Sequence, residues 1–128
     1  MKDSDTSLGS VLLIDDSKTD NFINTKVLEL SGKATSIHAF ETAANALAFL
    51  ANAEVFPDLI LLDVYMPIMN GFDFLEEYNQ LPDAKKKNTK VLLISSAYDT
   101  IEIEKLKKYK WVSGYIVKPL TYESLDSI

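Results

Sequence analysis

Five polar side chains stand where short apolar runs of the sequence end: Asp15, Asp16, Asp63, Ser95 and Lys118. Three of them are carboxylates, one is a hydroxyl and one is an ammonium. Carboxylates that lie close together in a partly buried site repel one another. A hard divalent cation removes that repulsion, and ligands that are all oxygens select Mg²⁺ or a similar ion. If the fold gathers these side chains, they predict a magnesium site.

The same side chains include the parts needed to move a phosphoryl group onto a carboxylate. An aspartate can act as the nucleophile of covalent catalysis. Phosphoryl transfer needs mainly positioning and neutralisation of charge on the equatorial oxygens. Mg²⁺ would take one of these oxygens, the Lys118 ammonium a second, and the Ser95 hydroxyl with nearby backbone N–H groups a third.

The stretch 57–67 predicts the central strand that presents the nucleophile. Its residues 59–62 are four apolar residues between turn formers, which is typical of a strand buried on both faces of a parallel sheet. Open α/β sheets place their ligands at the C-terminal ends of such strands. Asp63 therefore stands at a ligand-binding edge, where a buried carboxylate needs partners or a cation.

Further strands and helices alternate with this strand along the chain. Apolar runs predict four more strands, at 11–14, 34–40, 90–95 and 114–118. Amphipathic stripes and caps predict helices from Thr19 or Asp20 to Gly32, and at 41–52, 72–78, 100–108 and 121–128. Residues 81–88, which include three consecutive lysines, predict a solvated polar loop.

This alternation predicts a parallel sheet with helices on both faces, joined by right-handed crossovers. The strand at 34–40 is the least apolar and suits an edge. The expected fold class is therefore α/β, a flavodoxin-like doubly wound (βα)5 fold with a five-stranded parallel sheet in the order 2-1-3-4-5. In that fold the five polar side chains meet at one edge of the sheet.

The composition limits the classes of protein to consider. The chain has 128 residues, of which 47% are hydrophobic and 25% charged, as expected for one globular domain. We expect a flexible N-terminal tail at 1–10 and a domain at 11–128. A net charge of −6 argues against direct nucleic-acid binding. The sequence has no cysteine, no apolar run near ~20 residues and no signal-peptide core, so we expect a cytoplasmic protein that does not enter a membrane.

Four motifs in this order resemble the receiver domain of two-component response regulators, over residues 11–128. They are Asp15-Asp16 after an apolar strand, Asp63-x-x-Met66-Pro67, Ser95 after Val-Leu-Leu-Ile, and Lys118-Pro119. Each motif alone is weak, but the four together, each at a strand end, are specific. Other stretches, such as Gly71-Phe-Asp-Phe-Leu, are similar to stand-alone receivers that lack an output domain.

The resemblance implies a role for each residue of the metal and acceptor site. Asp63 would be the phosphoacceptor. Asp16 and Asp63 would bind Mg²⁺ directly, with the backbone carbonyl of Tyr65 as a third ligand and Asp15 acting mostly through water. The phosphoryl donor would be a sensor histidine kinase or a histidine phosphotransfer protein. Such a domain is not an enzyme for other substrates, because it catalyses only its own phosphorylation and dephosphorylation.

The resemblance also implies a switch that changes a surface for a downstream protein target. Ser95 and Lys118 would hold the phosphoryl group. Tyr115, three residues before Lys118, matches the aromatic residue of the family that turns inward when the Ser95 hydroxyl moves toward the phosphate.

Two positions depart from the family's usual residues. Tyr65, two residues after the acceptor, is bulky and could cover the approach of water. Ala97, two residues after Ser95, offers no carboxylate or amide to orient a water. We therefore expect slow self-dephosphorylation.

Two other classes of protein remain as alternatives. One is a pseudo-receiver, an interaction module that works without phosphorylation, but the complete set of five polar side chains argues against it. The other is an aspartyl-phosphate phosphatase of the haloacid-dehalogenase type. That enzyme would have a second acid two residues after the nucleophile, where this sequence has Tyr65.

Overall fold

The computed structural model describes residues 7–64, 66, 70–95, 104–105 and 108–128. The strands are β1 (Gly9–Ile14), β2 (Ala34–Phe40), β3 (Leu59–Asp63), β4 (Lys90–Ser95) and β5 (Val112–Val117). The helices are α1 (Lys18–Ser31), α2 (Ala43–Asn52), α3 (Gly71–Asn79), α4 (Asp83–Lys86) and α6 (Tyr122–Asp126). The strands form one parallel sheet in the order β2-β1-β3-β4-β5. The predicted flavodoxin-like fold is therefore confirmed.

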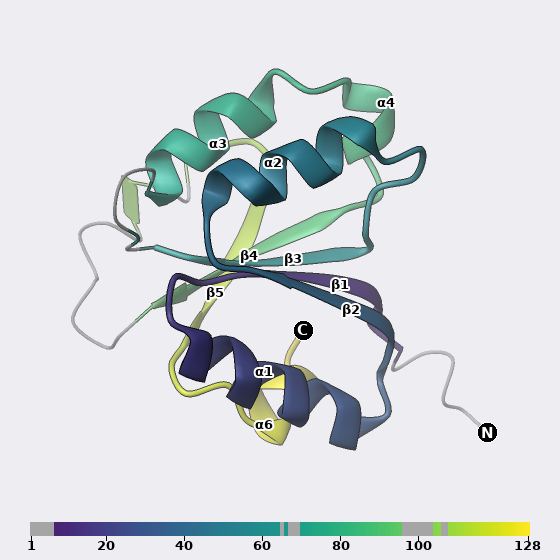
Figure 1. Ribbon diagram of the computed structural model, residues 1–128, viewed down its shortest axis with the longest axis vertical. Helices are drawn as coiled ribbons and strands as arrows, with labels where there is room; N and C mark the ends of the chain where they lie inside the picture. The colour runs from purple at the N-terminus through teal and green to yellow at the C-terminus, as the bar shows by residue number, and fades with distance from the viewer. Residues whose placement is uncertain (1–6, 65, 67–69, 96–103, 106–107) are drawn as a thin grey trace.

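Two layers of helices cover the sheet, with α2, α3 and α4 on one face and α1 and α6 on the other (Figure 1). Successive side chains of a strand point to opposite faces, so each central strand feeds both layers. Ile60 and Leu62 of β3 belong to the core beneath α2 and α3. Leu59 and Leu61 belong to the core shared with α1 and α6. All five residues of β3 are buried, as the uninterrupted apolar run predicts.

The register of the sheet brings the C-terminal ends of four strands level with one another. Ile14 of β1 pairs with Leu62 of β3, so the residues that follow each of them are neighbours. Asp63 pairs with Ile94 of β4, and Ser95 pairs with Val117 of β5. Because parallel strands all end at the same edge, this register decides which side chains meet there.

The N-cap of the first helix lies two residues before Thr19, the earlier of the two predicted caps. Ser17, not Thr19 or Asp20, is the N-cap of α1, and its hydroxyl accepts a hydrogen bond from the backbone N–H of Asp20 at 3.1 Å. Serine is among the best N-cap residues, and this choice places Asp20 in the first turn of the helix. The other end agrees with the prediction, because Gly32 adopts the left-handed conformation with φ of 71°.

The N-terminal ends of β1 and β5 also differ from the prediction. β1 begins at Gly9, two residues before the predicted start, and β5 begins at Val112, where the sequence predicted Gly114. Gly9 has a positive φ of 74°, and a Cβ there would lie 2.1 Å from the Asp58 carboxylate, so only glycine fits. Of the predicted helix at 100–108, Glu104 and Lys105 are helical, and most of the rest lies outside the described residues.

The expectation of a solvated loop at 81–88 is wrong for its central lysine. Residues 83–86 form the short helix α4, and the Lys86 side chain is fully buried. Its Nζ donates to the carbonyl oxygens of Tyr78 at 3.2 Å and Asn79 at 2.7 Å, and lies 4.7 Å from the ring centroid of Trp111. The last carbonyls of a helix have no partner within it, so this ammonium caps the end of α3. The sequence does not reveal this role, because Lys86 stands in a run of three lysines. Its neighbours Lys85 and Lys87 are exposed, as expected of a solvated loop.

We expect Lys86→Met to destabilise the protein by about 2–3 kcal/mol, because it leaves two carbonyls without their charged donor and removes the contact with the Trp111 ring. Urea unfolding followed by circular dichroism measures this change. Lys87→Met is the matched control, since it removes the same charge from an exposed neighbour and should shift the free energy of unfolding by less than about 0.5 kcal/mol. Equal stabilities of the two variants would show that the buried ammonium contributes nothing.

Candidate functional site

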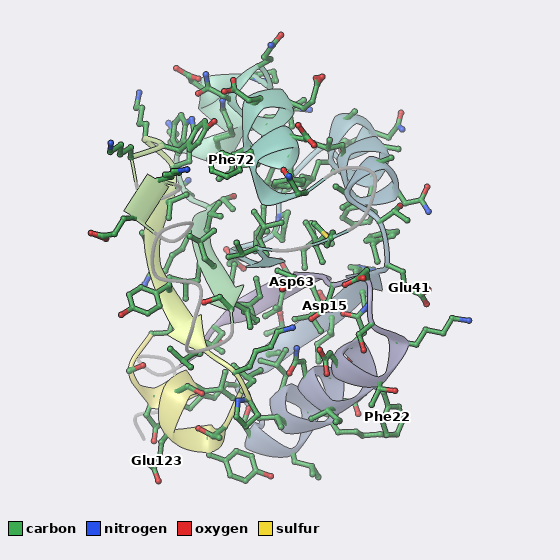
Figure 2. The ribbon with its side chains drawn as sticks, turned by 90° about the vertical axis from the view of Figure 1, so that its left-hand side faces the viewer. Asp15, Phe22, Glu41, Asp63, Phe72 and Glu123 are labelled. Atoms are coloured by element: carbon green, nitrogen blue, oxygen red, sulfur yellow. The ribbon has the colours of Figure 1, made fainter. Side chains whose placement is uncertain are left out.

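The five polar side chains predicted from the sequence come together at the C-terminal edge of the sheet. Asp63 and Ser95 are the last residues of β3 and β4, and Lys118 directly follows β5. Asp15 and Asp16 directly follow β1. Figure 2 shows Asp15 and Asp63 beside each other at this edge, between the ends of the strands and helix α1.

Three carboxylates form a compact acidic cluster. Each of Asp15, Asp16 and Asp63 offers an oxygen, and these oxygens all lie within 4.8 Å of one another. Asp15 and Asp63 are buried, whereas Asp16 is exposed and closes the outer side of the cluster. Tyr65, whose backbone carbonyl was the fourth predicted ligand, lies outside the described residues. The described part of the predicted metal site is therefore a set of oxygens small enough to surround one cation.

The Lys118 ammonium lies among three carboxylates. Its Nζ is 3.2 Å from Asp15 Oδ2 and 3.4 Å from Asp63 Oδ1. The shortest contact is with Asp20 Oδ2, at 3.0 Å. A hydrogen bond of 2.8 Å from the Lys118 backbone N–H to the carbonyl of Ser95 joins the end of β5 to the end of β4.

Asp20 was not among the predicted site residues. From the sequence, Asp20 was expected to cap a helix, because nothing in the apolar pattern links it to a strand end. Its place in the site follows from the cap at Ser17, which sets the first turn of α1 above the end of β1. The sequence did contain one indication of this role. Asp20 follows Asp16 by only four residues, and the first turn of a helix that begins directly after a strand end lies at the same edge of the sheet.

Asn21 is a second residue that the sequence analysis missed. It is buried, and its side-chain N–H groups donate to the backbone carbonyls of Asp15 at 2.9 Å and Phe40 at 3.3 Å. These bonds tie α1 to the ends of β1 and β2 and hold the turn that carries Asp15. Buried amides with backbone partners are common in any fold, so the residue type alone does not point to this role.

The positive charge of Lys118 lowers the pKa values of Asp15 and Asp63 by less than burial and mutual repulsion raise them. Burial raises the pKa of Asp63 from 3.8 to about 7, and the negative charge of Asp15 adds to this rise. Burial also raises the pKa of Asp15 above its usual value. For Lys118, burial alone would lower the pKa, but the hydrogen bond to Asp20 and the charges of Asp63 and Asp15 raise it. The site is thus short of positive charge.

Ser95 and Tyr115, the predicted phosphoryl-holding and switch residues, differ in burial. Ser95 is 1% exposed, and its hydroxyl has no hydrogen-bond partner among the described residues. A buried hydroxyl without a partner is costly, so it has capacity for an anionic oxygen. Tyr115 on β5 is 47% exposed. Its inward turn stays a prediction, and Ala97 lies outside the described residues.

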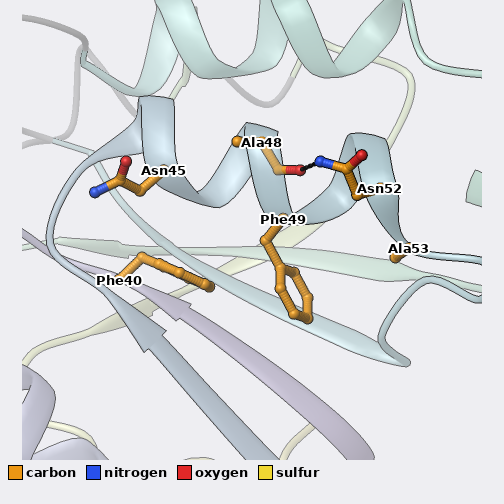
Figure 3. A pocket seen from close by; sticks show the side chains of 6 residues that line it. All are labelled: Phe40, Asn45, Ala48, Phe49, Asn52 and Ala53. Carbon is orange, nitrogen blue, oxygen red and sulfur yellow. Dashed lines mark hydrogen bonds between the residues drawn. The ribbon is translucent and has the colours of Figure 1, made fainter.

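A separate hollow of about 450 Å³ lies between α2 and β2 (Figure 3). It is lined by Phe40, Asn45, Ala48, Phe49, Asn52 and Ala53. None of these residues is charged, and the Asn52 side chain donates to the Ala48 carbonyl at 2.8 Å. The hollow therefore lacks the charged groups expected of a site that binds or transfers a phosphoryl group.

In the described part of the chain, no helix is long and apolar enough to cross a membrane.

Comparison with known proteins assigns this fold and site to a family. The family model described as "response regulator receiver domain" matches residues 11–128. The chain therefore belongs to the receiver domains of two-component signalling, as the sequence motifs predicted. A solved response regulator receiver protein from Dyadobacter fermentans is 34% identical, with a TM-score of 0.84 and 93% of each chain covered. A two-component response regulator from Cytophaga hutchinsonii is 31% identical, with a TM-score of 0.82 and 94% of this chain and 93% of the other covered.

Several longer proteins contain a similar segment. Response regulator Rcp1 of Synechocystis sp. is 31% identical over 106 residues, which are 79% of this chain and 72% of Rcp1. Transcriptional regulatory protein MalR of Bacillus subtilis is 32% identical over 92% of this chain, but the chain spans only 47% of MalR. It spans 14% of the sensor histidine kinase CheAY of Helicobacter pylori, to which it is 33% identical. The chain thus corresponds to one part of these larger proteins.

The raised pKa of Asp63 predicts a pH dependence of stability in protein kept free of metal with a chelator. Between pH 4 and pH 7 the folded state retains a proton that the unfolded state has lost, so stability should fall as the pH rises through this window. Asp63→Asn carries no such charge. We expect it to be more stable than wild type at pH 8 by about 2–3 kcal/mol, with a smaller difference at pH 5, because one pKa unit corresponds to about 1.4 kcal/mol.

Chemical denaturation at the two pH values measures this difference. If the stability difference between Asp63→Asn and wild type is the same at pH 8 as at pH 5, Asp63 is ionised in the folded protein without an energetic cost.

Proposed function

We propose that this receiver domain takes a phosphoryl group onto Asp63 from a phosphohistidine of a sensor histidine kinase or a histidine phosphotransfer protein. In this step the P–N bond of the phosphohistidine breaks, an O–P bond to the Asp63 carboxylate forms, and the histidine leaves with the electron pair on its ring nitrogen. The observation that carries the proposal is the meeting of Asp63 with an ammonium and two further carboxylates at one strand edge.

The acidic cluster fits a magnesium ion. Its donors are all oxygens, they lie within reach of one small cation, and the raised pKa values of Asp63 and Asp15 indicate that the site lacks positive charge. Asp15, Asp16 and Asp63 would hold the ion, with the Tyr65 carbonyl as the further expected ligand. A bound Mg²⁺ supplies neutralisation of the acceptor and of one phosphoryl oxygen. Lys118 and the Ser95 hydroxyl would hold the remaining phosphoryl oxygens.

A surface beside the site suits the protein that donates the phosphoryl group. Phe22 and Ile23 follow Asp20 on α1 and are 63% and 45% exposed. Neighbouring exposed apolar side chains next to a reactive group are typical of a surface for a protein partner. Figure 2 shows Phe22 on the outer side of α1, on the same face of the molecule as Asp63. Phosphorylation would then change the surface offered to a downstream protein target.

The alternatives explain fewer of these features. A pseudo-receiver would need neither the buried acceptor nor the ammonium beside it. A phosphatase of the haloacid-dehalogenase type needs a second acid two residues after the nucleophile, where Tyr65 stands. Slow loss of the phosphoryl group, expected from Tyr65 and Ala97, remains a proposal because both residues lie outside the described part of the chain.

The acceptor is tested by exposing the protein to phosphoramidate and Mg²⁺ and measuring its intact mass. We expect the wild type to gain one phosphoryl group and Asp63→Asn to gain none, because an amide is similar in size to a carboxylate but is not a nucleophile. Circular dichroism checks that the variant is folded. Equal mass gain in both proteins would remove Asp63 from the reaction.

The metal site is tested by titration calorimetry with Mg²⁺. Asp16→Ala should lose at least about tenfold in affinity, because affinity follows the number of charged ligands. In the wild type the affinity should rise between pH 6 and pH 7.5 and then level off, because a carboxylate with a pKa of about 7 must lose its proton to bind the metal. Glu54→Ala removes an exposed charge elsewhere and is the control. Equal affinities of the two variants, or a flat pH profile, would contradict the site.

A further inference from the structure

The Lys118 ammonium has more partners than its role toward the phosphoryl group requires. An ammonium has three N–H donors, and three carboxylates contact this one: Asp20 at 3.0 Å, Asp15 at 3.2 Å and Asp63 at 3.4 Å. Of these three contacts only the one with Asp20 is a hydrogen bond, whereas those with Asp15 and Asp63 are ion pairs without one. A phosphoryl oxygen that draws the ammonium toward Asp63 therefore competes first with the hydrogen bond to Asp20.

The three carboxylates differ in how easily they can release the lysine. The Asp15 side chain is 4% exposed and the Asp63 side chain 8%, so water can reach neither of them freely. The Asp20 side chain is 38% exposed. An ionised group that loses its partner must be solvated or pay a large desolvation penalty. Asp20 is therefore the carboxylate that loses least when the lysine leaves.

Helix α1 stabilises the negative charge of Asp20 even when Lys118 does not contact it. It lies in the first turn of α1, where the helix dipole and the unpaired N–H groups favour a negative charge. The Ser17 hydroxyl accepts a hydrogen bond from its backbone N–H at 3.1 Å, which fixes this turn. The carboxylate can thus give up Lys118 without disturbing the helix that carries it.

We propose that Asp20 is a positioning residue that holds the Lys118 ammonium in the unphosphorylated protein and competes with the phosphoryl group for it. This inference rests on the proposed function of Asp63 as acceptor. When the phosphoryl group arrives, the ammonium exchanges Asp20 for a phosphoryl oxygen. The freed carboxylate becomes hydrated in the turn that precedes the exposed Phe22 and Ile23, so the exchange alters the charge of this surface.

The experiment measures binding of beryllofluoride, a mimic of the phosphoryl group that adds to aspartate carboxylates, in the presence of Mg²⁺ and by ¹⁹F NMR. Asp20→Asn should bind it about tenfold more tightly than the wild type, because no charge-assisted hydrogen bond must first be broken. Glu29→Gln removes the same charge from the far end of α1 and should stay within about twofold of the wild type. Asp20→Glu keeps a carboxylate and should return the affinity toward the wild-type value.

A double-mutant cycle with Lys118→Ala separates competition for the lysine from simple charge repulsion. If Asp20 acts through Lys118, Asp20→Asn should change the affinity by less than about twofold when the lysine is absent. The same gain in both backgrounds, or no gain in the presence of the lysine, overturns the proposal.

A second readout does not depend on the weak binding of the Lys118→Ala variant. In the wild type, the ¹³C resonance of the Asp20 carboxyl should shift on saturation with beryllofluoride, because this group exchanges an ammonium for water. An unmoved resonance overturns the inference. If the wild type binds no beryllofluoride and takes no phosphoryl group, the proposed function itself fails. If the wild type does both and Asp20→Asn behaves identically, only the role of Asp20 falls.

Discussion

A shortage of positive charge at the C-terminal edge of the sheet governs this molecule. Among the described residues, the Lys118 ammonium contacts the carboxylates of Asp15, Asp20 and Asp63, and a fourth carboxylate, that of Asp16, lies beside Asp15 and Asp63. Because Asp15 and Asp63 are buried, water cannot compensate for the imbalance, and the pKa of Asp63 rises to about 7. The fold therefore holds Asp63, the proposed phosphoacceptor, in an environment that favours an added cation. Sites of this kind trade stability for function, since the same charges would be harmless if they were exposed.

The rest of the architecture keeps these charges together despite their repulsion. The strand register sets Asp63 beside the residue that follows β1, and the bond between the Lys118 N–H and the Ser95 carbonyl fixes the end of β5. Asn21 ties α1 to the end of β1. The apolar cores on both faces supply the stability that such an arrangement consumes. Elsewhere, the buried ammonium of Lys86 caps the end of α3, contacts the Trp111 ring and pairs with Asp83, so its charge has a structural role.

The sequence predicted the fold class and the five polar side chains at the strand ends because both depend on short-range patterns. Apolar runs identify buried strands, and strand ends in a parallel sheet are neighbours by topology. It could not predict contacts set by helix phase or by tertiary packing. Helix α1 is capped by Ser17, which places Asp20 in the first turn, within reach of Lys118. The apolar periodicity of the sequence does not distinguish Ser17 from Thr19 as the cap. Likewise Lys86 is one of three consecutive lysines, and tertiary contacts with the end of α3, the Trp111 ring and Asp83 distinguish it from its neighbours.

The order of the site residues along the chain has a consequence for how the protein is made. A ribosome synthesises Asp15, Asp16 and Asp63 well before Lys118, so the carboxylates emerge first and their counter-charge comes last. Pairing of β5 with β4 brings the Lys118 ammonium to these carboxylates, so the fifth strand gains electrostatic attraction as well as burial. The lysine that we propose holds a phosphoryl oxygen thus also favours completion of the sheet.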